Sequence, residues 1–337
     1  MKIAVTGGAG FIGSNFIHFM KKKHPDIEII CIDSLTYAGN ADNIVSLNNG
    51  SRFNFFKADI TDSAAIYYIL DNEKPDAVVN FAAETHVDRS IGNSLVFLST
   101  NIIGTHTLLE ACLKTGVKRF HQISTDEVYG ELPLDKPELK FSENSPLMPS
   151  SPYSASKASA DMLVYSYYKT FGLNTTVSRC SNNYGDYQFP EKLIPLMISN
   201  ALGGVPLPVY GDGKNIRDWI HVTDHCEAID LILRCGKSGG VYNIGGGCEL
   251  ENIEVVKKII ALMGKSEELI EYIPDRKGHD LRYAVDYSKI EAELGWKPSI
   301  SFEKGLSDTV DWYVNNFQWL ERIKTGEYRS SVFSGKV

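Results

Sequence analysis

The chain has 337 residues, of which 43% are hydrophobic and 23% are charged, as in an ordinary globular protein. Its formal net charge of -8 argues against a general surface for nucleic acid or acidic membrane, although a local basic pocket can still hold an anionic small molecule. We find no apolar run of membrane-spanning length, and the chain opens directly with the strand-like run KIAVT in place of a signal peptide. We therefore expect a cytoplasmic protein that binds no membrane and no nucleic acid.

Short β-rich runs alternate with amphipathic stretches through the first half of the chain. The predicted strands are Ile3–Thr6, Ile29–Asp33, Arg52–Ala58, Ala77–Phe81, Phe120–Ser124 and Asn174–Arg179. The predicted helices between them include Ser14–Lys23, Ser63–Leu70 and Ile103–Lys114. This alternation predicts βαβ units and an α/β fold, a Rossmann-type doubly wound parallel sheet.

The pattern changes at about residue 181, where prolines begin to separate shorter, mixed elements. The run GLSDTVDWYVNNFQWL near the end reads as a helical stretch with aromatic residues on one side. We predict a first domain over residues 1–180, interleaved with later segments, and a smaller α/β lobe formed mainly by residues 181–337.

The run VTGGAGFIGS follows the first predicted strand and opens the first predicted helix. Gly7, Gly10 and Gly13 permit a tight turn and the close approach of a pyrophosphate, which the N–H groups of the helix N-terminus can bind. Asp33 ends the second predicted strand about 20 residues beyond, where its carboxylate can accept hydrogen bonds from a ribose and would repel a 2′-phosphate. The pattern predicts NAD as cofactor in preference to NADP.

Two side chains in the run SPYSASKASAD have the spacing of a base and its activating cation. Tyr153 and Lys157 lie four residues apart, so on a helix they share a face, and Pro152 suits the helix start. A nearby ammonium favours the phenolate form of a tyrosine, and a nicotinamide cation adds to this effect. We therefore expect Tyr153 to take a proton from a sugar hydroxyl while hydride leaves to NAD.

Nine motifs occur along the chain in an order that identifies a family. They are the glycine loop, AAETHVDRS, STDEVYG, SPYSASKASAD, SNNYG, FPEKLIP, GDGKNIRDWIHV, YNIGGG and DRKGHDLRY. From residue 1 to about residue 315 the chain resembles the dTDP-glucose 4,6-dehydratases, a family of the extended short-chain dehydrogenase/reductase superfamily. The glycine loop and Y-x-x-x-K mark only the superfamily, whereas the triplet Thr125, Asp126 and Glu127 is specific to the dehydratases.

The resemblance implies a task for the two adjacent acids. A hydride transfer needs only Thr125, Tyr153 and Lys157, but loss of water from C5 and C6 of a hexose needs two more proton carriers. By resemblance, Asp126 is the acid that protonates the departing C6 hydroxyl and Glu127 is the base that takes the C5 proton. Adjacent carboxylates in one pocket push their pKa values apart, so that one stays protonated while the other ionises.

The resemblance also implies the binding residues for NAD and for the substrate, dTDP-glucose. NAD would contact Gly7, Gly10, Phe11, Ile12, Gly13, Asp33, Ser34, Leu35, Thr36, Asp59, Ile60, Phe81, Ala82, Ala83, Thr100, Tyr153, Lys157 and Asn183. Asp59 alone is equally typical of the start of a helix. The sugar nucleotide would contact Thr85, Thr125, Asn182, Lys192, Leu193, Pro208, Val209, Tyr210, Arg217, Asn243, Asp275, Arg276 and His279. Arginines can fork onto diphosphate oxygens and Tyr210 can stack on a pyrimidine, while local packing explains Leu193 and Pro208 equally well.

Several alternatives stay open at the level of sequence. An NAD-dependent epimerase or decarboxylase of sugar nucleotides would use the same scaffold but leave Asp126 and Glu127 without a task, and a non-catalytic NAD-sensing module would need neither acid. A dehydratase of another nucleotide hexose fits as well, and the deoxysugar pathway, rhamnose or another, is not specified. The superfamily implies a homodimer built on a four-helix interface. Asp186 stands where the family usually has proline, and no metal-ligand spacing is present, so we predict no metal site.

Overall fold

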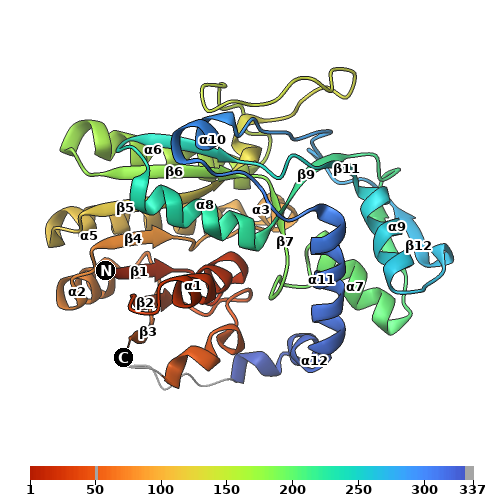
Figure 1. The fold of residues 1–337 in the computed structure, drawn as a ribbon, viewed down its shortest axis with the longest axis horizontal. Helices are drawn as coiled ribbons and strands as arrows, with labels where there is room; N and C mark the ends of the chain where they lie inside the picture. Colours follow the sequence, from red (N-terminus) through yellow and green to blue (C-terminus); the bar gives the residue numbers. More distant parts are fainter. Residues whose placement is uncertain (50–51, 331–337) are drawn as a thin grey trace.

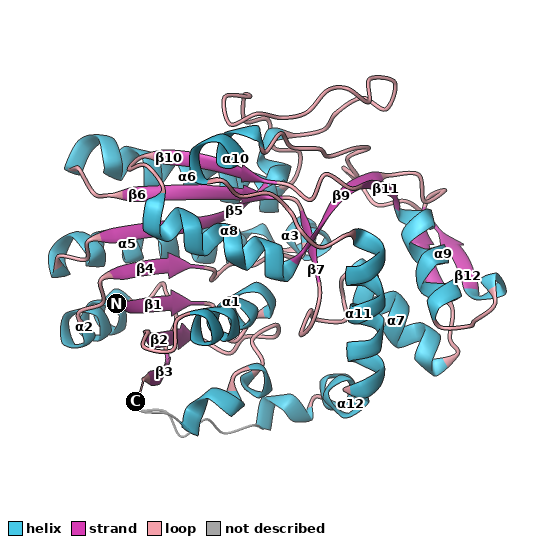
Figure 2. Cartoon of the chain, in the orientation of Figure 1, coloured by secondary structure: helices cyan, strands magenta, loops and turns pink. Residues whose placement is uncertain are grey.

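The computed structural model describes residues 1–49 and 52–330, and its centre is a parallel sheet (Figures 1 and 2). In spatial order its seven strands are β10 (Gly240–Ile244), β6 (Thr175–Cys180), β5 (Arg119–Thr125), β4 (Ala77–Asn80), β1 (Lys2–Thr6), β2 (Glu28–Asp33) and β3 (Phe53–Lys57). All neighbouring pairs are parallel. The order reverses direction at β1, which is the doubly wound arrangement, so the predicted fold class is confirmed.

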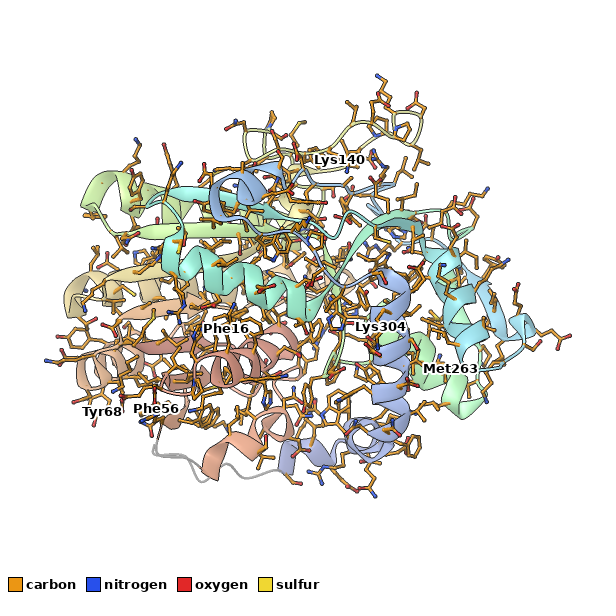
Figure 3. The ribbon with its side chains drawn as sticks, viewed as in Figure 1. Phe16, Phe56, Tyr68, Lys140, Met263 and Lys304 are labelled. Carbon is orange, nitrogen blue, oxygen red and sulfur yellow. The ribbon has the colours of Figure 1, made fainter. Side chains whose placement is uncertain are left out.

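Helices cover both faces of this sheet, so its central strands are buried on both sides. On one face lie α1 (Phe11–Lys23) and α8 (Val222–Cys235), and on the other lie α2 (Ser63–Glu73), α5 (Thr105–Thr115) and α6 (Pro152–Phe171). Successive residues of β1 alternate between the two cores, with Ile3 packing toward α1 and Ala4 toward α2. Figure 3 shows Phe16 buried between α1 and the sheet and Lys140 on an exposed loop at the edge of the molecule.

A smaller lobe stands at the carboxyl ends of the strands. It contains the sheet β11 (Glu249–Glu251), β9 (Ile216–His221), β7 (Asn182–Tyr184) and the pair β12 (Ile270–Ile273) and β8 (Leu207–Tyr210). Around one shared core pack α7 (Leu193–Gly203), α9 (Asn252–Leu262) and α11 (Phe302–Asn315). The remaining helices are α3 (Val87–Gly92), α4 (Ser94–Phe97), the π-helix η3 (Leu98–Gly104), α10 (Ser288–Leu294) and α12 (Phe317–Thr325).

The chain crosses between the two parts more than once. After β7 and β9 in the small lobe, α8 and β10 return to the large sheet. This path agrees with a first domain that is interleaved with later segments. The division near residue 181 remains our proposal. The last seven positions of the predicted second domain, 331–337, lie outside the described residues.

One expectation about a helix is wrong. The aromatic-rich run near the C-terminus is not one helix: α11 ends and α12 begins at Asn316, which has φ -111° and ψ 35° and whose amide donates to Trp312 O at 2.9 Å. Among the described residues, one continuous helical stretch, Ser94–Thr115, is long and apolar enough by composition to cross a membrane, and half of its apolar window is buried in the protein. Asn101 and Thr105 interrupt its apolar sequence, but both are buried and hydrogen-bonded within the structure.

Candidate active site

The glycine loop joins β1 to α1 at the carboxyl edge of the large sheet. Gly7 has φ +66°, and a Cβ there would lie 2.6 Å from the backbone nitrogen of Ala82. A Cβ on Gly13 would lie 2.3 Å from the carbonyl oxygen of Gly7, so the first turn of α1 packs directly on the loop. Gly10 is the N-cap of α1, and the free N–H groups of that helix start face the cleft that the loop lines. The loop is therefore built to receive a pyrophosphate.

Asp33 ends β2 beside this loop and is buried at the floor of the cleft. Its Oδ2 accepts a hydrogen bond from Ala9 N at 2.9 Å, and its Oδ1 accepts one from Leu35 N at 2.8 Å. Each carboxylate oxygen has a further lone pair for a ribose hydroxyl. The aspartate thus holds the loop in shape and still presents its charge to the cofactor position.

The other predicted cofactor residues converge on the same cleft with one exception. It is lined by Gly7, Gly10, Phe11, Ile12, Gly13, Asp33, Ser34, Thr36, Asp59, Ile60, Phe81, Ala82, Ala83, Thr100, Tyr153, Lys157 and Asn183. Leu35 is the exception: its side chain packs against the core between α1 and the sheet. Asp59 accepts hydrogen bonds from Thr61, and the N-cap of α2 is Asp62, so Asp59 does not start the helix.

The two acids lie where β5 ends. Thr125 is the last residue of β5 and caps the short 3₁₀ helix η4 (Asp126–Tyr129), accepting a hydrogen bond from Glu127 N at 3.3 Å. The Thr125 hydroxyl donates to Asp126 Oδ1 at 3.3 Å. Among residues 1–49 and 52–330, Asp126 Oδ2 has no hydrogen-bond partner although it is buried. All three side chains line the cleft, beside the predicted cofactor residues.

The environment separates the two carboxyl groups. Burial raises the pKa of Asp126 well above its usual range, and the neighbouring charges of Glu127 and Asp218 raise it further. Burial also raises the pKa of Glu127, but the positive charges of Arg276, Lys192 and Arg217 oppose that shift. Mutual repulsion, which the sequence suggests as the main cause, is secondary to burial. Asp126 is the group held protonated and Glu127 the group held closer to ionisation.

Tyr153 and Lys157 lie on the first two turns of α6. Ser151 caps this helix with a reciprocal bond to Ser154, and Pro152 occupies its first position. Lys157 Nζ donates to the carbonyl oxygen of Ile123, in β5, at 2.6 Å. Burial raises the pKa of Tyr153 well above its usual range, followed by the negative charge of Glu127. Burial thus opposes the phenolate expected at Tyr153, which remains a prediction.

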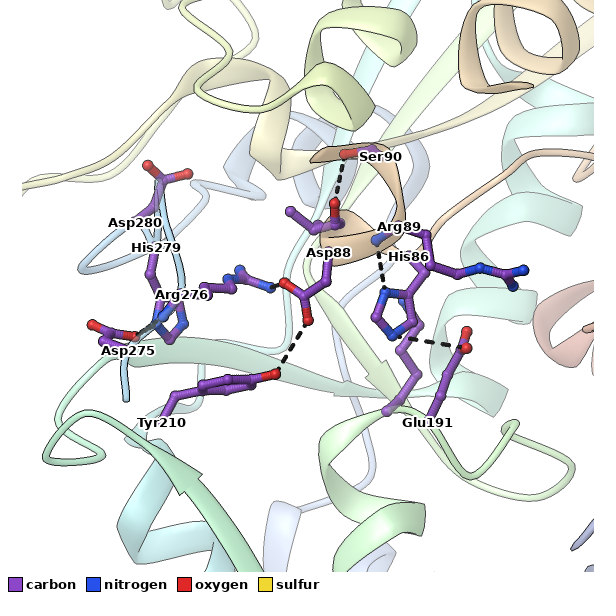
Figure 4. A network of polar contacts seen from close by, with 12 residues as sticks. His86, Asp88, Arg89, Ser90, Glu191, Tyr210, Asp275, Arg276, His279 and Asp280 are labelled. Atoms are coloured by element: carbon purple, nitrogen blue, oxygen red, sulfur yellow. Dashed lines mark hydrogen bonds and ion pairs between the residues drawn. The ribbon is translucent and has the colours of Figure 1, made fainter. Parts of the chain in front are cut away.

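The predicted substrate residues divide into three groups. Thr85, Asn182 and Lys192 line the cleft, and Lys192 Nζ donates to Thr85 O at 2.9 Å. A second cluster lies on β8 and the loop after β12, outside the lining of the cleft (Figure 4). It comprises Tyr210, Asp275, Arg276 and His279, and His279 Nδ1 lies 2.6 Å from Asp275 Oδ1.

Asp88, from α3, bridges to the second cluster. Its Oδ2 accepts a hydrogen bond from Tyr210 Oη at 3.2 Å, and its Oδ1 lies 3.8 Å from Arg276 Nη1 (Figure 4). The positive charge of Arg276 also opposes the rise in the pKa of Glu127, so the cluster interacts electrostatically with the acids. An anion that enters between Tyr210 and Arg276 takes the position that the Asp88 carboxylate holds.

Five predicted substrate residues have internal partners or packing instead. Arg217 is buried, donates to Asp280 O at 2.9 Å and stacks 4.4 Å from the ring centroid of Tyr283. Asn243 is fully buried, accepts from Tyr129 Oη at 2.7 Å and donates to Phe141 O at 2.9 Å. Val209 and Leu193 belong to the core of the small lobe, and Pro208 pairs in β8 with Glu271. The geometry gives no support for a substrate contact by Asn243, Val209 or Leu193.

Comparison with known proteins matches this geometry to a family. A family model described as GDP-mannose 4,6 dehydratase matches residues 4–309. The chain is 49% identical to the dTDP-glucose 4,6-dehydratase of Salmonella typhimurium over 98% of both chains. It is 47% identical to DesIV, the dTDP-glucose 4,6-dehydratase of Streptomyces venezuelae solved with NAD bound, with a TM-score of 0.92 over 96% of this chain and 100% of that one.

This chain belongs to the dTDP-glucose 4,6-dehydratase family. The family model and the relatives are named for different sugar nucleotides but for the same 4,6-dehydration. A UDP-glucose 4-epimerase from Thermotoga maritima has the same fold at lower identity, 31%, with a TM-score of 0.87 over 94% of this chain and 100% of that one. The fold is therefore shared with epimerases. The difference between dehydratase and epimerase activity must then come from the residues of the site.

Two acids of this dehydratase-family site were not predicted from the sequence. Glu84 and Glu191 also line the cleft, and Glu191 accepts a hydrogen bond from Tyr37 Oη at 3.0 Å. Each acid directly precedes a residue that we predict from the sequence as a substrate contact, Thr85 or Lys192. Their positions in AAETHVDRS and FPEKLIP were the available signal. In the part of the chain that the structure describes, no group of three or more His, Cys, Asp or Glu residues could hold a metal ion.

Asp186, the departure from the family pattern, lies outside the cleft lining. Its carbonyl oxygen accepts from Asn15 Nδ2, on α1, at 2.8 Å, and burial raises the pKa of its side chain to about 6. The next residue, Tyr187, has φ +65° and packs against Trp312 at a centroid distance of 4.8 Å. The loop with Asp186 thus contacts both α1 and α11, and its next residues, Gln188 and Phe189, line the cleft directly.

Proposed function

We propose that this chain converts dTDP-glucose to dTDP-4-keto-6-deoxyglucose and water, with an NAD that is regenerated in each turnover. The observation that carries this is the burial of Asp126 and Glu127 in one cleft with Tyr153 and Lys157. The glycine cradle and Asp33 fit NAD, and the relative DesIV was solved with it. NAD, when bound, accepts a hydride from C4 and gives it back at C6.

Tyr153 and Lys157 serve the oxidation. Tyr153 takes the proton of the C4 hydroxyl as hydride leaves C4, so that a ketone forms there. The positive charge of the oxidised nicotinamide favours the phenolate, and so works against the pKa rise that burial imposes on Tyr153. Lys157, fixed by its bond to Ile123 O, keeps a cation on the same helix face.

Asp126 and Glu127 serve the elimination. With C4 a ketone, the carbanion left at C5 is an enolate, so Glu127 can take the C5 proton as its base. Asp126, held protonated by burial, gives its proton to the C6 hydroxyl, and water departs with the C6–O bond electrons. Hydride returning to C6 and a proton to C5 complete the 6-deoxy sugar.

The sugar nucleotide lies between the cleft and the second cluster in this proposal. Lys192 and Thr85 mark the sugar end, next to the acids, and Arg276 and Tyr210 mark the diphosphate and base end. An arginine can bind a diphosphate through two parallel hydrogen bonds, and a tyrosine ring can stack on a pyrimidine. A diphosphate there takes over the interactions that Asp88 now makes with Arg276 and Tyr210.

We propose a homodimer formed through the stretch Ser94–Thr115 and α6. Large apolar side chains are exposed along both: Leu95 at 72%, Ile103 at 53%, Met162 at 59% and Tyr165 at 51%. The membrane-like composition of the first stretch is then the composition of a subunit interface. A second copy that brings the same two helices makes a four-helix contact. A cytoplasmic location and a role in deoxysugar formation for a polysaccharide, such as rhamnose, belong to the same proposal.

The test is product analysis with separate incubations in dTDP-, UDP- and CDP-glucose. A 4-keto-6-deoxy sugar absorbs strongly in alkali and an epimer does not, so the assay separates dehydratase from epimerase. We expect the absorbing product from dTDP-glucose and NAD bound to the protein as purified. An epimerised sugar, or a cofactor-free protein that added NAD does not activate, contradicts the proposal.

A further inference from the structure

Two residues of the quoted motifs have no role so far. Asp161 is the last residue of SPYSASKASAD, and Tyr129 follows the acid pair in STDEVYG. The structure joins them through Arg179, in β6. The three side chains are almost fully buried, with exposures of 3% for Asp161, 2% for Tyr129 and 6% for Arg179. A charge pair buried this deeply is costly unless its geometry is good, so its bonds are informative.

Arg179 binds a different partner on each side. Its Nε donates to Asp161 Oδ2 at 2.9 Å, and its Nη1 donates to Tyr129 Oη at 3.0 Å. Tyr129 Oη in turn donates to Asn243 Oδ1 at 2.7 Å, so the phenol has both an acceptor and a donor role filled. The Tyr129 ring stacks on Phe141 at a centroid distance of 5.0 Å. Tyr129 is thereby fixed in position and orientation.

Tyr129 belongs to the same short helix as the acids. In η4 it follows Asp126 by three residues and Glu127 by two. A 3₁₀ helix of four residues has little rigidity of its own, so its orientation depends on its contacts. The bonds of Tyr129 to Arg179 and Asn243 therefore set the direction in which Asp126 and Glu127 face the cleft.

Asp161 belongs to the same helix face as the hydride-transfer groups. It follows Lys157 by four residues on α6, as Lys157 follows Tyr153. Burial lowers the pKa of Lys157, and the charges that oppose this come from Asp161, on α6, and Cys180, on β6. The carboxylate of Asp161, itself held by Arg179, thus supplies a nearby negative charge for the Lys157 ammonium.

We propose that Asp161, Arg179 and Tyr129 form one positioning network that serves both halves of the reaction. Through Asp161 it places a carboxylate one helical turn from the lysine of the oxidation, and through Tyr129 it orients the acids of the elimination. The inference rests on the proposed function, because it assigns the two ends of the network to two half-reactions. None of the three residues lines the cleft, so they act through Lys157, Asp126 and Glu127.

The first test is Tyr129→Phe, which removes only the hydroxyl and keeps the ring against Phe141. We expect NADH formation from dTDP-glucose to keep the wild-type rate, while exchange of the C5 proton with deuterated water slows by about 10- to 100-fold. The matched control is Tyr167→Phe on α6, which removes a hydroxyl bonded to Glu110 at 2.6 Å, outside the cleft. The control should leave both rates unchanged.

The second test is Asp161→Asn, followed through the pH dependence of NADH formation. With the carboxylate gone, the Lys157 ammonium loses its proton at lower pH, so the alkaline limb of the profile should move to lower pH. The rate at neutral pH should fall by about 10- to 100-fold with KM for the sugar nucleotide unchanged. Asp230→Asn is the control: this buried aspartate also pairs with an arginine (2.7 Å to Arg234 Nε), and the variant should leave the profile in place.

Each outcome bears on one claim. If Tyr129→Phe folds and its C5 exchange keeps the wild-type rate, the network does not orient the acids, and the inference is wrong. The same holds if Asp161→Asn is folded and its alkaline limb does not move; if that variant does not fold, Tyr129→Phe alone decides. Failure of the wild-type protein to form a 4-keto-6-deoxy sugar is a different result, because it removes the proposed function itself.

Discussion

Glu127→Gln isolates the proposed base of the elimination. The substitution replaces one carboxylate oxygen by an amide nitrogen of nearly the same size, so the packing of η4 is kept. What changes is the charge, which the structure places among the cations Arg276, Lys192 and Arg217. The hydride-transfer residues are untouched, since Tyr153 lies on a different element, α6.

The expected cost follows from the role. Loss of a general base typically slows the step it serves by about 10²- to 10⁴-fold, or about 3–5 kcal/mol of barrier. That cost should fall on elimination alone. Glu127 must be ionised to act, and burial raises its pKa, so the wild-type elimination rate should rise with pH through this raised pKa. The variant should lose that acid limb.

Single-turnover mixing with dTDP-glucose, followed by NADH absorbance, measures both steps. The wild type should form NADH and then consume it as hydride returns to the sugar. Glu127→Gln should form NADH at the wild-type rate and then accumulate it with the 4-keto sugar, without C5 exchange in deuterated water. Glu110→Gln, at a carboxylate bonded to Tyr167 outside the cleft, is the matched control. Elimination at the wild-type rate in Glu127→Gln would refute the argument and favour an epimerase-like activity.

Three further predictions use other parts of the molecule. Tyr153→Phe should abolish NADH formation in the same experiment, and normal NADH formation would show that another group is the base. Gly13→Ala places a Cβ 2.3 Å from the carbonyl oxygen of Gly7, an overpacking worth about 1–3 kcal/mol, so calorimetric titration should show NAD binding about 5- to 150-fold weaker. Gly92→Ala, with nothing within 4 Å of the new Cβ, should bind NAD normally, and equal affinities for both variants would contradict the cradle. Asp230→Asn should lower the free energy of unfolding by about 1–3 kcal/mol at neutral pH, because Asp230 is buried and bonds His24 and Arg234. These partners hold the pKa of Asp230 below its usual value, so the stability that Asp230 contributes is present above its pKa in the unfolded chain and is lost as the pH falls through its pKa in the folded protein. Urea unfolding at neutral pH and at about pH 3 should therefore show the difference in unfolding free energy between wild type and Asp230→Asn becoming smaller. A difference that stays constant would count against this linkage.

The cofactor half of the site was predictable because its signals are local. The glycine loop and Asp33 end neighbouring parallel strands, and such strand ends always meet at one edge of the sheet. Thr125 to Glu127 end a third strand at that edge for the same reason. Among the predicted cofactor residues only Leu35 does not line the cleft, because its backbone has φ +53° and its side chain turns back into the core.

The rest of the site depends on contacts between residues far apart in the sequence, which the spacing of motifs does not predict. Nothing in the sequence brings Asp88, on α3, to Tyr210, on β8, 122 residues later. Asn243 lies within the motif YNIGGG, yet its side-chain oxygen accepts a hydrogen bond from Tyr129 within the protein. Burial raises the pKa of Tyr153, and burial is a property of the assembled fold that the spacing to Lys157 does not report.

The late return of α8 and β10 to the large sheet matters for a chain that grows on a ribosome. When β6 has been made, the face of the sheet over α1 still lacks Ile229 and Leu233, and β6 is still an open edge. Apolar surface and an unpaired strand are the features that lead nascent chains to aggregate or to recruit chaperones. The cofactor half therefore has to wait about 60 residues for its last strand while the first elements of the small lobe are made. A fragment that stops at residue 181 is therefore an unfinished sheet, which still lacks α8 and β10.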